Sequence, residues 1–505
     1  MFSLQKILQW FRRNLSLKDW GLILIIIILF LATRLILLDK FPIFTDEGIY
    51  INWAKIAKVD ASWRFISLTD GKQPLQTWFT IFFLKFFPDN PLLAGRLFAV
   101  LGGAAALKGL FFLSWYLFGK KAAFWSAFLY IFTPFFLFYD RLALVDSFVN
   151  AGFIWILFLS ILLAKNLRLD FALIFGLASG MFSLSKSSIR MFVALSLLSP
   201  ILFLEKNVKN FFNKLLNFSA LYIIVIGLTL LIYNVQRLSP FLHYVAEKNK
   251  TFVMTFSEFL QSPFLVFFHN FKIIPWYIFW ESGFILPLIG VVGLFFLFKK
   301  NLKVAVYLTL WIILPYLIIS LFGKVVYPRY LNFFATLLLI LATYFFVYIK
   351  NKKVIVYIVI LLFASFIYFD YPILFNQSRI SFPEIDRIQY IEGVSSGYGL
   401  KEIVDFSHEK GKEKQVVLLA EGNFGVVGDM LNSSLGLNEK SINVRGYWPL
   451  DKKNLIENQK DLSKDFVYIV FSHRTDFPKD WPMKFIKKFE KPNNKSAFYL
   501  FELTK

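Results

Sequence analysis

Long apolar segments separated by short polar ones fill the first three quarters of the chain. The segments Gly21–Leu38 and Val354–Phe369 contain almost no charged residues. A helix needs about twenty apolar residues to cross the hydrocarbon layer of a bilayer. Applied along the chain, this criterion predicts an all-α polytopic membrane module over residues 1–372, with about eleven transmembrane helices.

Two longer connections interrupt this pattern. Residues 39–91 form the first, and its first half is too polar to cross a bilayer. Its second half holds a short aromatic run, Leu75–Phe87, which predicts a helix lying along the membrane interface. Residues 234–281 form the second long connection. Both connections are expected on the outer side of the membrane.

The positions of lysine and arginine predict the orientation of the chain. The basic residues Lys6, Arg12, Arg13 and Lys18 precede the first apolar segment, so we expect a cytoplasmic N-terminus. Every loop that this orientation assigns to the cytoplasm then contains at least two basic residues. The net charge of +22 therefore reflects loop asymmetry in a multi-pass protein of the plasma (inner) membrane, and nucleic-acid binding is excluded.

The composition becomes polar after Pro372. Three strand-like runs, Gln415–Leu419, Phe466–Phe471 and Ala497–Leu503, lie beyond a helix-like run at Leu400–Lys410. This alternation predicts a small α/β domain over residues 373–505. An odd number of preceding spans makes this C-terminal domain extracytoplasmic. The run from Gly422 to Gly425 follows the first of these strands and predicts a turn rather than a phosphate loop.

The chain has no cysteine and four histidines, so thiol chemistry and a histidine-rich metal centre are not expected. None of the histidines stands at zinc-ligand spacing. They are His243, His269, His408 and His473. No cofactor is required by the sequence, although an acid-rich site could recruit a divalent cation such as Mg²⁺ or Mn²⁺.

Charged residues gather at the predicted outer ends of the spans. They come from five separate segments but occupy one layer of the protein. They are Asp46, Glu47, Lys72, Asp140, Arg141, Asp146, Lys186, Arg190, Lys324 and Arg329. Ionisable groups near membrane depth are costly and mark functional sites. A site in this layer would combine carboxylates that abstract a proton with cations that bind a phosphate.

Several of these residues also have a structural explanation. Asp46 and Glu47 would suit the positive end of a helix, and Asp146 would suit a helix N-cap. Lys72 could extend its ammonium group toward lipid headgroups. That explanation is weaker for the basic residues of two other outer turns, because basic residues are disfavoured on the outer side. They are Lys186, Arg190, Lys324 and Arg329.

Six short motifs, in order along residues 34–330, resemble those of the GT-C superfamily. The similarity is to protein O-mannosyltransferases and lipid A aminoarabinose transferases. The first motif is Asp46-Glu47-Gly48-Ile49-Tyr50, and the second is Lys72-Gln73-Pro74-Leu75, where Gln73 replaces a proline. The others are Arg96-Leu97 with Gly102-Gly103, Arg141 to Asp146, Gly180 to Lys186, and Arg329-Tyr330.

The resemblance implies a glycosyltransferase that takes its sugar from a polyprenyl-phosphate carrier. It implies that Asp46 is the catalytic base, assisted by Asp146 and Glu47, and that transfer inverts the anomeric centre. It further implies that cations bind the carrier phosphate. The residues assigned to donor binding are Lys72, Arg329, Lys186, Arg141, Tyr330 and Lys324. The acceptor is an unspecified hydroxyl on a protein, lipid or glycan.

Two other functions fit parts of the pattern. A transporter or flippase for a lipid-linked sugar would use the same cations and a lipid groove, without transfer chemistry. Transporters usually have repeated halves and charges at the membrane midplane. In this chain the charges lie at one face and the halves do not match. A membrane-anchored assembly protein, acting through residues 373–505, is the other alternative.

Overall fold

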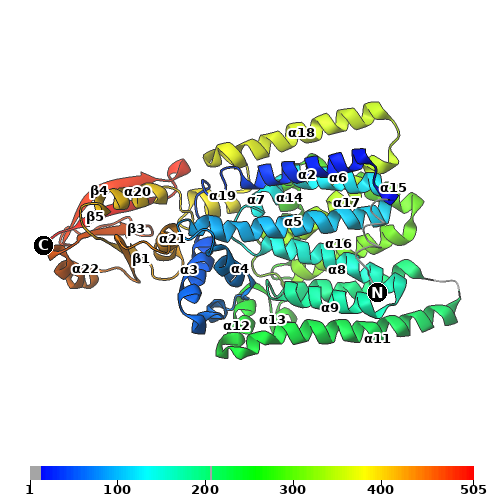
Figure 1. Cartoon of the computed structure of the whole chain (residues 1–505), viewed down its shortest axis with the longest axis horizontal. Coiled ribbons are helices and arrows are strands. Elements are labelled where there is room, and N and C mark those ends of the chain that lie inside the picture. Colours follow the sequence, from blue (N-terminus) through cyan, green and yellow to red (C-terminus); the bar gives the residue numbers. More distant parts are fainter. Residues whose placement is uncertain (1–12, 205–206) are drawn as a thin grey trace.

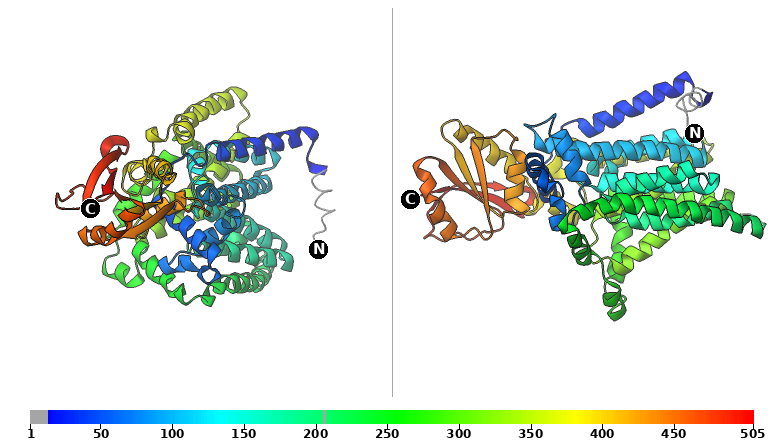
Figure 2. Two further views of the ribbon diagram at one scale, coloured as in Figure 1. Left: turned by 60° about the vertical axis from the view of Figure 1, so that its left-hand side comes forward. Right: turned by 60° about the horizontal axis from the view of Figure 1, so that its bottom comes forward.

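A computed structural model describes residues 13–204 and 207–505, and it consists of a helical bundle with an α/β domain at one end (Figure 1). Most helices of the bundle lie along its long axis, as a second direction of view also shows (Figure 2). The main bundle helices are α2 (Leu17–Leu35), α5 (Pro91–Phe118), α6 (Lys120–Phe132), α7 (Pro134–Tyr139), α8 (Asp146–Asn166), α9 (Leu169–Ser183), α10 (Ile189–Leu195), η3 (Ser196–Phe203), α11 (Val208–Tyr233), α14 (Phe267–Glu281), α15 (Ile285–Lys300), α16 (Leu302–Phe322), α17 (Asn332–Tyr348) and α18 (Lys352–Phe375).

Several of these helices can cross a membrane. In the described chain, six helices are long and apolar enough to do so, or seven if α14 and α15, which meet at 109°, count as one. Helices α9 and α10–η3 are apolar but shorter. The structure confirms a polytopic, mainly helical membrane protein with a small C-terminal sheet. The count of about eleven spans stays a prediction, because breaks such as Thr133-Pro134 divide apolar segments into shorter helices.

Helix α2 shows how charges are accommodated near an apolar segment. Asp19 pairs with Lys120 at 2.7 Å, and the fully buried Arg34 pairs with Asp140 at 3.2 Å. Between these charges, the helix exposes a row of isoleucine and leucine side chains. Each end of α2 is therefore fixed to the bundle by an ion pair, while its middle is apolar enough to face lipid.

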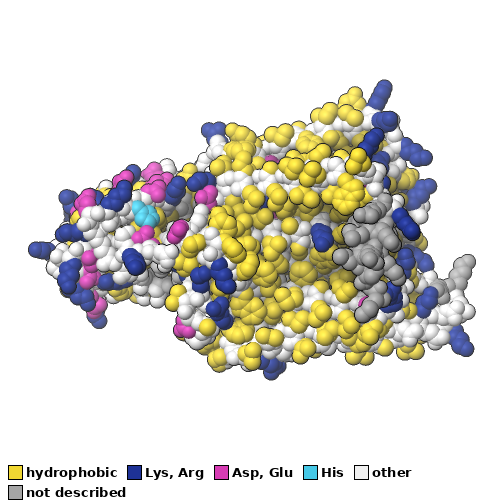
Figure 3. Space-filling model, in the orientation of Figure 1, with side chains coloured by type: hydrophobic (Ala, Val, Ile, Leu, Met, Phe, Trp, Pro, Cys, Tyr) yellow, Lys and Arg dark blue, Asp and Glu magenta, His cyan; other side chains and the backbone are white. Residues whose placement is uncertain are grey.

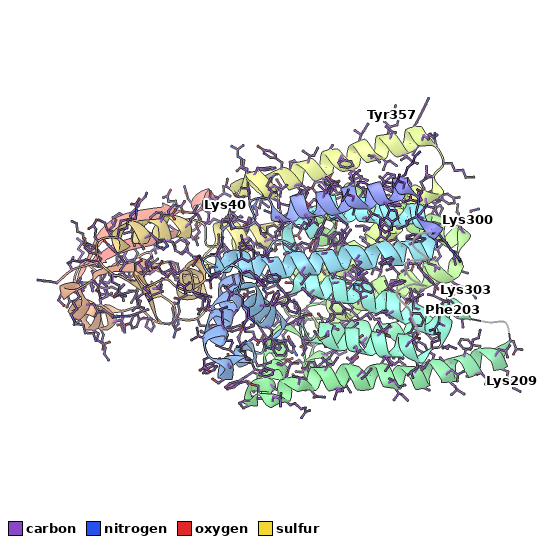
Figure 4. The ribbon with its side chains drawn as sticks, viewed as in Figure 1. Lys40, Phe203, Lys209, Lys300, Lys303 and Tyr357 are labelled. Carbon is purple, nitrogen blue, oxygen red and sulfur yellow. The ribbon has the colours of Figure 1, made fainter. Side chains whose placement is uncertain are left out.

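The two ends of the bundle differ in charge and in what they contact. Lys209, Lys300 and Lys303 lie at the end farthest from the α/β domain, and Lys40 lies at the junction with that domain (Figure 4). An apolar surface separates the two ends (Figure 3). We call them the basic end and the domain end. This separation agrees with the loop assignment from charge, although Lys6 and Arg12 lie outside the described residues.

The predicted outer connections are mostly helical. Residues 39–91 form α3 (Thr45–Val59), two short 3₁₀ turns, Ala61–Trp63 and Ile66–Asp70, and α4 (Leu75–Phe83). Residues 267–281 of the second predicted connection, 234–281, belong to the bundle helix α14, and the residues before them contain α12 (His243–Phe252) and α13 (Phe256–Gln261). These helices lie at the domain end of the bundle (Figure 1). The interfacial helix expected at Leu75–Phe87 corresponds to α4.

The C-terminal domain is a five-stranded sheet covered by helices. The strand order is β2-β1-β3-β5-β4, with β1 parallel to β2 and β3, and β5 antiparallel to β3 and β4. Helices α20 and α21 pack on one face, and α22 packs on the other. The elements are α19 (Glu384–Arg387), α20 (Leu400–Gly411), β1 (Val416–Glu421), α21 (Val426–Ser434), β2 (Ile442–Tyr447), α22 (Lys452–Asn458), β3 (Phe466–Phe471), β4 (Met483–Glu490) and β5 (Ala497–Leu503).

Helix α3 is held between the bundle and this domain. Gly48 lies against Met430 of α21, where a side chain on the glycine would come within 3.1 Å of the methionine backbone. Asn52 donates to Asp429 at 2.6 Å, and Lys55 Nζ donates to the carbonyl of Asn432 at 2.5 Å. The small residue permits close packing, and the polar contacts fix the position of α3 along α21.

Candidate active site

The candidate site begins at the first turn of α3. Phe44 precedes the helix in an extended conformation, and Asp46 and Glu47 occupy its first turn. Backbone N–H groups at a helix start are unpaired and favour negative charge. Asp46 keeps 25% of its side chain exposed, whereas Glu47 is completely buried. The local sequence therefore places two neighbouring acids in opposite environments.

Two cations from distant parts of the chain converge on Asp46. Lys72 Nζ lies 3.2 Å from Asp46 Oδ1, and Arg329 Nη2 lies 2.9 Å from Asp46 Oδ2. Lys72 follows the 3₁₀ turn that ends at Asp70, and Arg329 lies in η6 (Pro328–Leu331). Each carboxylate oxygen thus has its own cation. The structure brings together three residues that the sequence assigned to one site.

A second ion pair lies beside the first. Lys186 Nζ is 2.8 Å from Asp146 Oδ1 and 3.9 Å from the centroid of the Tyr330 ring. The guanidinium of Arg329 also faces that ring, at 5.4 Å. Tyr330 therefore contacts cations of both pairs. Asp146, Lys186 and Tyr330 join the Asp46 cluster, which gives one group of two acids and three cations.

Aromatic side chains surround these charges. Lys72 Nζ lies 5.0 Å from the ring centroid of Tyr50 and 5.6 Å from that of Trp53. Both rings come from α3, at the spacing that follows Asp46 by about one and two turns. A cation near an aromatic face gains about 0.5–2 kcal/mol, depending on its exposure to water. The rings hold the lysine ammonium in place while it still faces the site.

The cations change the basicity of Asp46. Burial raises the pKa of this carboxyl, but Lys72 and Arg329 outweigh that effect and hold the pKa well below its usual range. Asp46 is therefore ionised in the free protein. Arg329 has two further nitrogens, Nε and Nη1, which are buried without a hydrogen-bond partner among the described residues. Buried donors of this kind are costly unless a ligand accepts from them.

Three predicted site residues lie outside this cluster. Both oxygens of Glu47 accept hydrogen bonds from Arg96, and they also accept from backbone N–H groups of Phe44 and Ala143. Arg141 donates to carbonyls at the end of α2, including that of Ile36 at 2.7 Å. These contacts satisfy the polar groups locally, which is a structural arrangement.

Lys324 is the third residue that the structure does not bring to Asp46. Its Nζ donates to Glu258 Oε1 at 2.7 Å and to the carbonyl of Lys250 at 2.9 Å. It therefore joins the start of α13 to the end of α16. Tyr327 of the same connection has its ring 5.3 Å from the guanidinium of Arg329.

The sequence reasoning missed Asp70 and Lys248. Asp70 accepts from Lys248 Nζ at 2.6 Å and lies 3.5 Å from Lys72 Nζ. Gly71 follows Asp70 with φ +66°, and an added side chain would come within 2.5 Å of the Tyr244 carbonyl. The second outer connection therefore packs closely on the Lys72 turn. Gly71, next to Lys72, was a signal in the sequence that another segment packs closely on this turn. The sequence could not show that this segment is α12, which is far away along the chain.

The acids do not form a metal site by their arrangement. In residues 13–204 and 207–505, no group of three or more His, Asp or Glu side chains is placed to hold a metal ion. Asp46 and Asp70 both contact Lys72 instead. Mg²⁺ prefers octahedral oxygen ligands. The cations that contact the acids of this site are the side chains of Lys72, Arg329 and Lys186.

Comparison with known families supports an assignment. Residues 71–233 match the family model described as dolichyl-phosphate-mannose-protein mannosyltransferase. This segment includes Lys72, Asp146 and Lys186 of the cluster. No curated protein sequence matches the chain.

The fold is similar to that of two proteins of known structure. ArnT from Cupriavidus metallidurans in the apo state is 12% identical, with a TM-score of 0.60 over 96% of this chain and 98% of that chain. The same protein bound to undecaprenyl phosphate gives a TM-score of 0.60 at 11% identity and the same coverage. The oligosaccharyltransferase AglB from Archaeoglobus fulgidus, in complex with an inhibitory peptide and a dolichol-phosphate, gives 0.52 at 12% identity over 91% and 70%.

These similarities define the fold as that of the GT-C class of membrane proteins. More narrowly, residues 71–233 are similar to the protein mannosyltransferase family, and this match covers less than half of the chain. The resemblance inferred from the motifs is confirmed at this level.

Proposed function

We propose that this protein transfers a sugar from a polyprenyl-phosphate carrier to an acceptor hydroxyl, at the membrane surface on the domain end of the bundle. The observation that carries this proposal is the convergence of Lys72 and Arg329 on Asp46. A base beside phosphate-binding cations is what such a transfer requires. The plasma membrane is the proposed location, with the domain end outside.

The phosphate of the donor would bind to lysine and arginine side chains that contact Asp46 and Asp146 in the free protein. Arg329 has two buried nitrogens without a partner, and a phosphate can accept from a guanidinium through two oxygens at once. Lys72 and Lys186 would supply the remaining positive charge. The leaving group is a phosphate that is already anionic, so it requires charge stabilisation more than protonation.

An apolar cavity supports the lipid part of the proposed donor. It measures about 410 Å³ and opens on the side of the bundle, where Leu288 and Val291 are more than half exposed. Helix α14, which forms one wall, also packs against η6, which carries Arg329. The cavity is lined by Ile274, Pro275, Ile278, Phe279, Pro287, Leu288, Val291, Ile312, Tyr316, Phe334 and Leu338. Its lining suits isoprene units, whose burial is favourable and non-directional.

The proposed chemical step is one direct displacement. The acceptor oxygen forms a bond to the sugar C1, and the bond between C1 and the phosphate oxygen breaks. The phosphate leaves with the electron pair, attached to its polyprenyl chain, and the hydroxyl proton moves to Asp46. Attack opposite the leaving group inverts the configuration at C1.

Donor binding would also prepare the base. In the free protein, Lys72 and Arg329 contact Asp46 and make it a weak base. A donor phosphate would compete for both cations and draw their charge away from Asp46. The carboxylate would then accept a proton more readily, in the presence of the donor.

The direct test is sugar transfer by the purified full-length protein. With labelled polyprenyl-phosphate sugars and a cell-envelope extract as acceptor source, we expect a labelled product and released polyprenyl phosphate. The Arg329→Ala protein should lose most of its binding of the sugar donor. The substitution removes the side chain that has two nitrogens free to donate hydrogen bonds to the phosphate. Exposed Arg379→Ala on the same chain is the matched control. Failure of every polyprenyl-phosphate sugar to react would contradict the proposed function.

The transporter alternative is not favoured, because both the family match and the structural neighbours are transferases. In a reconstituted vesicle, a transporter would move the intact lipid-linked sugar without releasing polyprenyl phosphate. Measurement of that release distinguishes the two functions.

A further inference from the structure

The carboxyl ends of the parallel strands in the C-terminal domain meet next to the catalytic helix. Strand β1 has β2 on one side and β3 on the other, so the strand order reverses at β1. Helix α21, which follows β1, packs on one face of the sheet, and α22, which precedes β3, packs on the other. Open α/β sheets bind ligands outside the carboxyl ends of the strands at such a reversal.

The turn after β1 borders the Asp46 cluster. This turn, Gly422–Gly425, connects β1 to α21, and α21 lies against α3 (Figure 1). The ring of Phe424 is 6.0 Å from that of Trp53, and Trp53 is one of the two rings beside Lys72. Thr45, next to the catalytic acid, lies within 3.2 Å of where a side chain on Gly425 would begin. The turn is therefore continuous with the active site.

The side chains at this edge are aromatic and half exposed. Phe424 has 50% of its surface exposed and Trp448, just after β2, has 63%. Trp448 packs edge-on against the ring of His473, which follows β3, at 5.4 Å. The two loops are adjacent, because Gly422 N–H donates to the Tyr447 carbonyl at 2.8 Å. Exposed aromatic rings on neighbouring loops offer an apolar surface that a ligand can cover.

A buried carboxylate completes the edge. Glu421 ends β1 and is 5% exposed, and its Oε2 accepts from the N–H groups of Ser472 and His473 at 2.8 and 2.7 Å. Its other oxygen, Oε1, accepts no hydrogen bond from the described residues. The carboxylate is thus rigidly held with one oxygen available as an acceptor.

We propose that this edge, formed by Glu421, Phe424, Trp448 and His473, binds a carbohydrate portion of the acceptor. A sugar ring presents an apolar C–H face, which suits the exposed rings, and hydroxyl groups, which suit a carboxylate and an imidazole. This proposal rests on the proposed function, in which the sugar donor binds to Lys72 and Arg329 on one side of Asp46. The acceptor then approaches from the side of the C-terminal domain, past Phe424 and Trp53.

Binding can be tested without turnover. Saturation-transfer NMR on the full-length protein in detergent, with maltotriose and chitotriose as probes, should show transfer to sugar C–H protons. Phe424→Ala and Trp448→Ala should each weaken this binding about tenfold. Phe424→Trp should restore it. Phe485→Ala is the control, because Phe485 is an equally exposed ring, 54%, on strand β4 of the same domain.

Kinetics give a second, independent measurement. With the acceptor varied, Phe424→Ala should raise the acceptor KM about tenfold and leave the donor KM unchanged. Binding of a Ser/Thr peptide but no oligosaccharide at Phe424 would overturn the carbohydrate assignment. An unchanged acceptor KM in an active Phe424→Ala protein would overturn the subsite, while an inactive wild-type protein would instead contradict the proposed function.

Discussion

Asp46 and Glu47 are neighbours in the chain, but they lie in contrasting environments. Asp46 is partly exposed and contacts Lys72 and Arg329, and Arg329 has two further nitrogens without a partner among the described residues. Glu47 is fully buried, and its two oxygens accept four hydrogen bonds, two from Arg96 and two from the backbone. The comparison teaches that two adjacent carboxylates can differ in availability. A carboxylate whose hydrogen bonds are all made within the protein is held as a structural group, whereas one that is partly exposed beside cations can take part in chemistry.

The largest effect is expected from substitution of Asp46, the proposed catalytic member of the pair. Asp46→Asn keeps the size of the side chain but removes the base, so we expect sugar transfer to fall about 100- to 10,000-fold. The unfolding temperature should fall less than for Glu47→Gln, because Asp46 is 25% exposed and an asparagine can still accept a hydrogen bond from Arg329. Donor binding, measured separately, should persist. Transfer at the wild-type rate would remove Asp46 from the mechanism.

The substitution Glu47→Gln tests whether Glu47 has a structural role. The substitution leaves the buried Arg96 without its counter-charge, which costs about 3–5 kcal/mol when one partner of a buried pair is removed. We expect a clear drop in the unfolding temperature, and any loss of transfer should follow the loss of folded protein. If Glu47→Gln protein stays as stable as the wild type but loses transfer, Glu47 acts in catalysis after all.

The smallest effect concerns pH. Lys72 and Arg329 hold the pKa of Asp46 well below its usual range in the free protein, so the acid limb of kcat/KM should lie at low pH. The donor phosphate would draw these cations away from Asp46 and so raise the pKa of its carboxyl. The acid limb of kcat should therefore lie at higher pH than that of kcat/KM. Coincident limbs would show that donor binding does not change the base.

Much of the fold could be predicted from local pattern. The strands Phe466–Phe471 and Ala497–Leu503 and the helix from Leu400 match the structure closely. Two strands were missed. Strand β4 reads Met-Lys-Phe-Ile-Lys-Lys-Phe-Glu and is mostly exposed, so it lacks the apolar run that marks a buried strand. Strand β2 lies at the other edge of the sheet and is also only partly buried.

The candidate site was only partly predictable. Asp46, Lys72 and Arg329 were found because their positions along the chain imply one membrane layer. The same criterion also selected Arg141 and Lys324, whose contacts lie elsewhere. Charge and membrane depth identify a layer, but they do not specify which side chains meet within it.

By itself, the sequence determined a polytopic membrane protein with a polar α/β domain and with acids and cations at one end. Hydrophobic length and charge are properties of short segments, so they can be read without knowledge of contacts. The tertiary structure alone decided that Lys72 and Arg329 converge on Asp46, while Arg96 encloses Glu47. It also decided that the β1–α21 turn borders the candidate active site, because the packing of α21 on α3 joins residues almost four hundred positions apart.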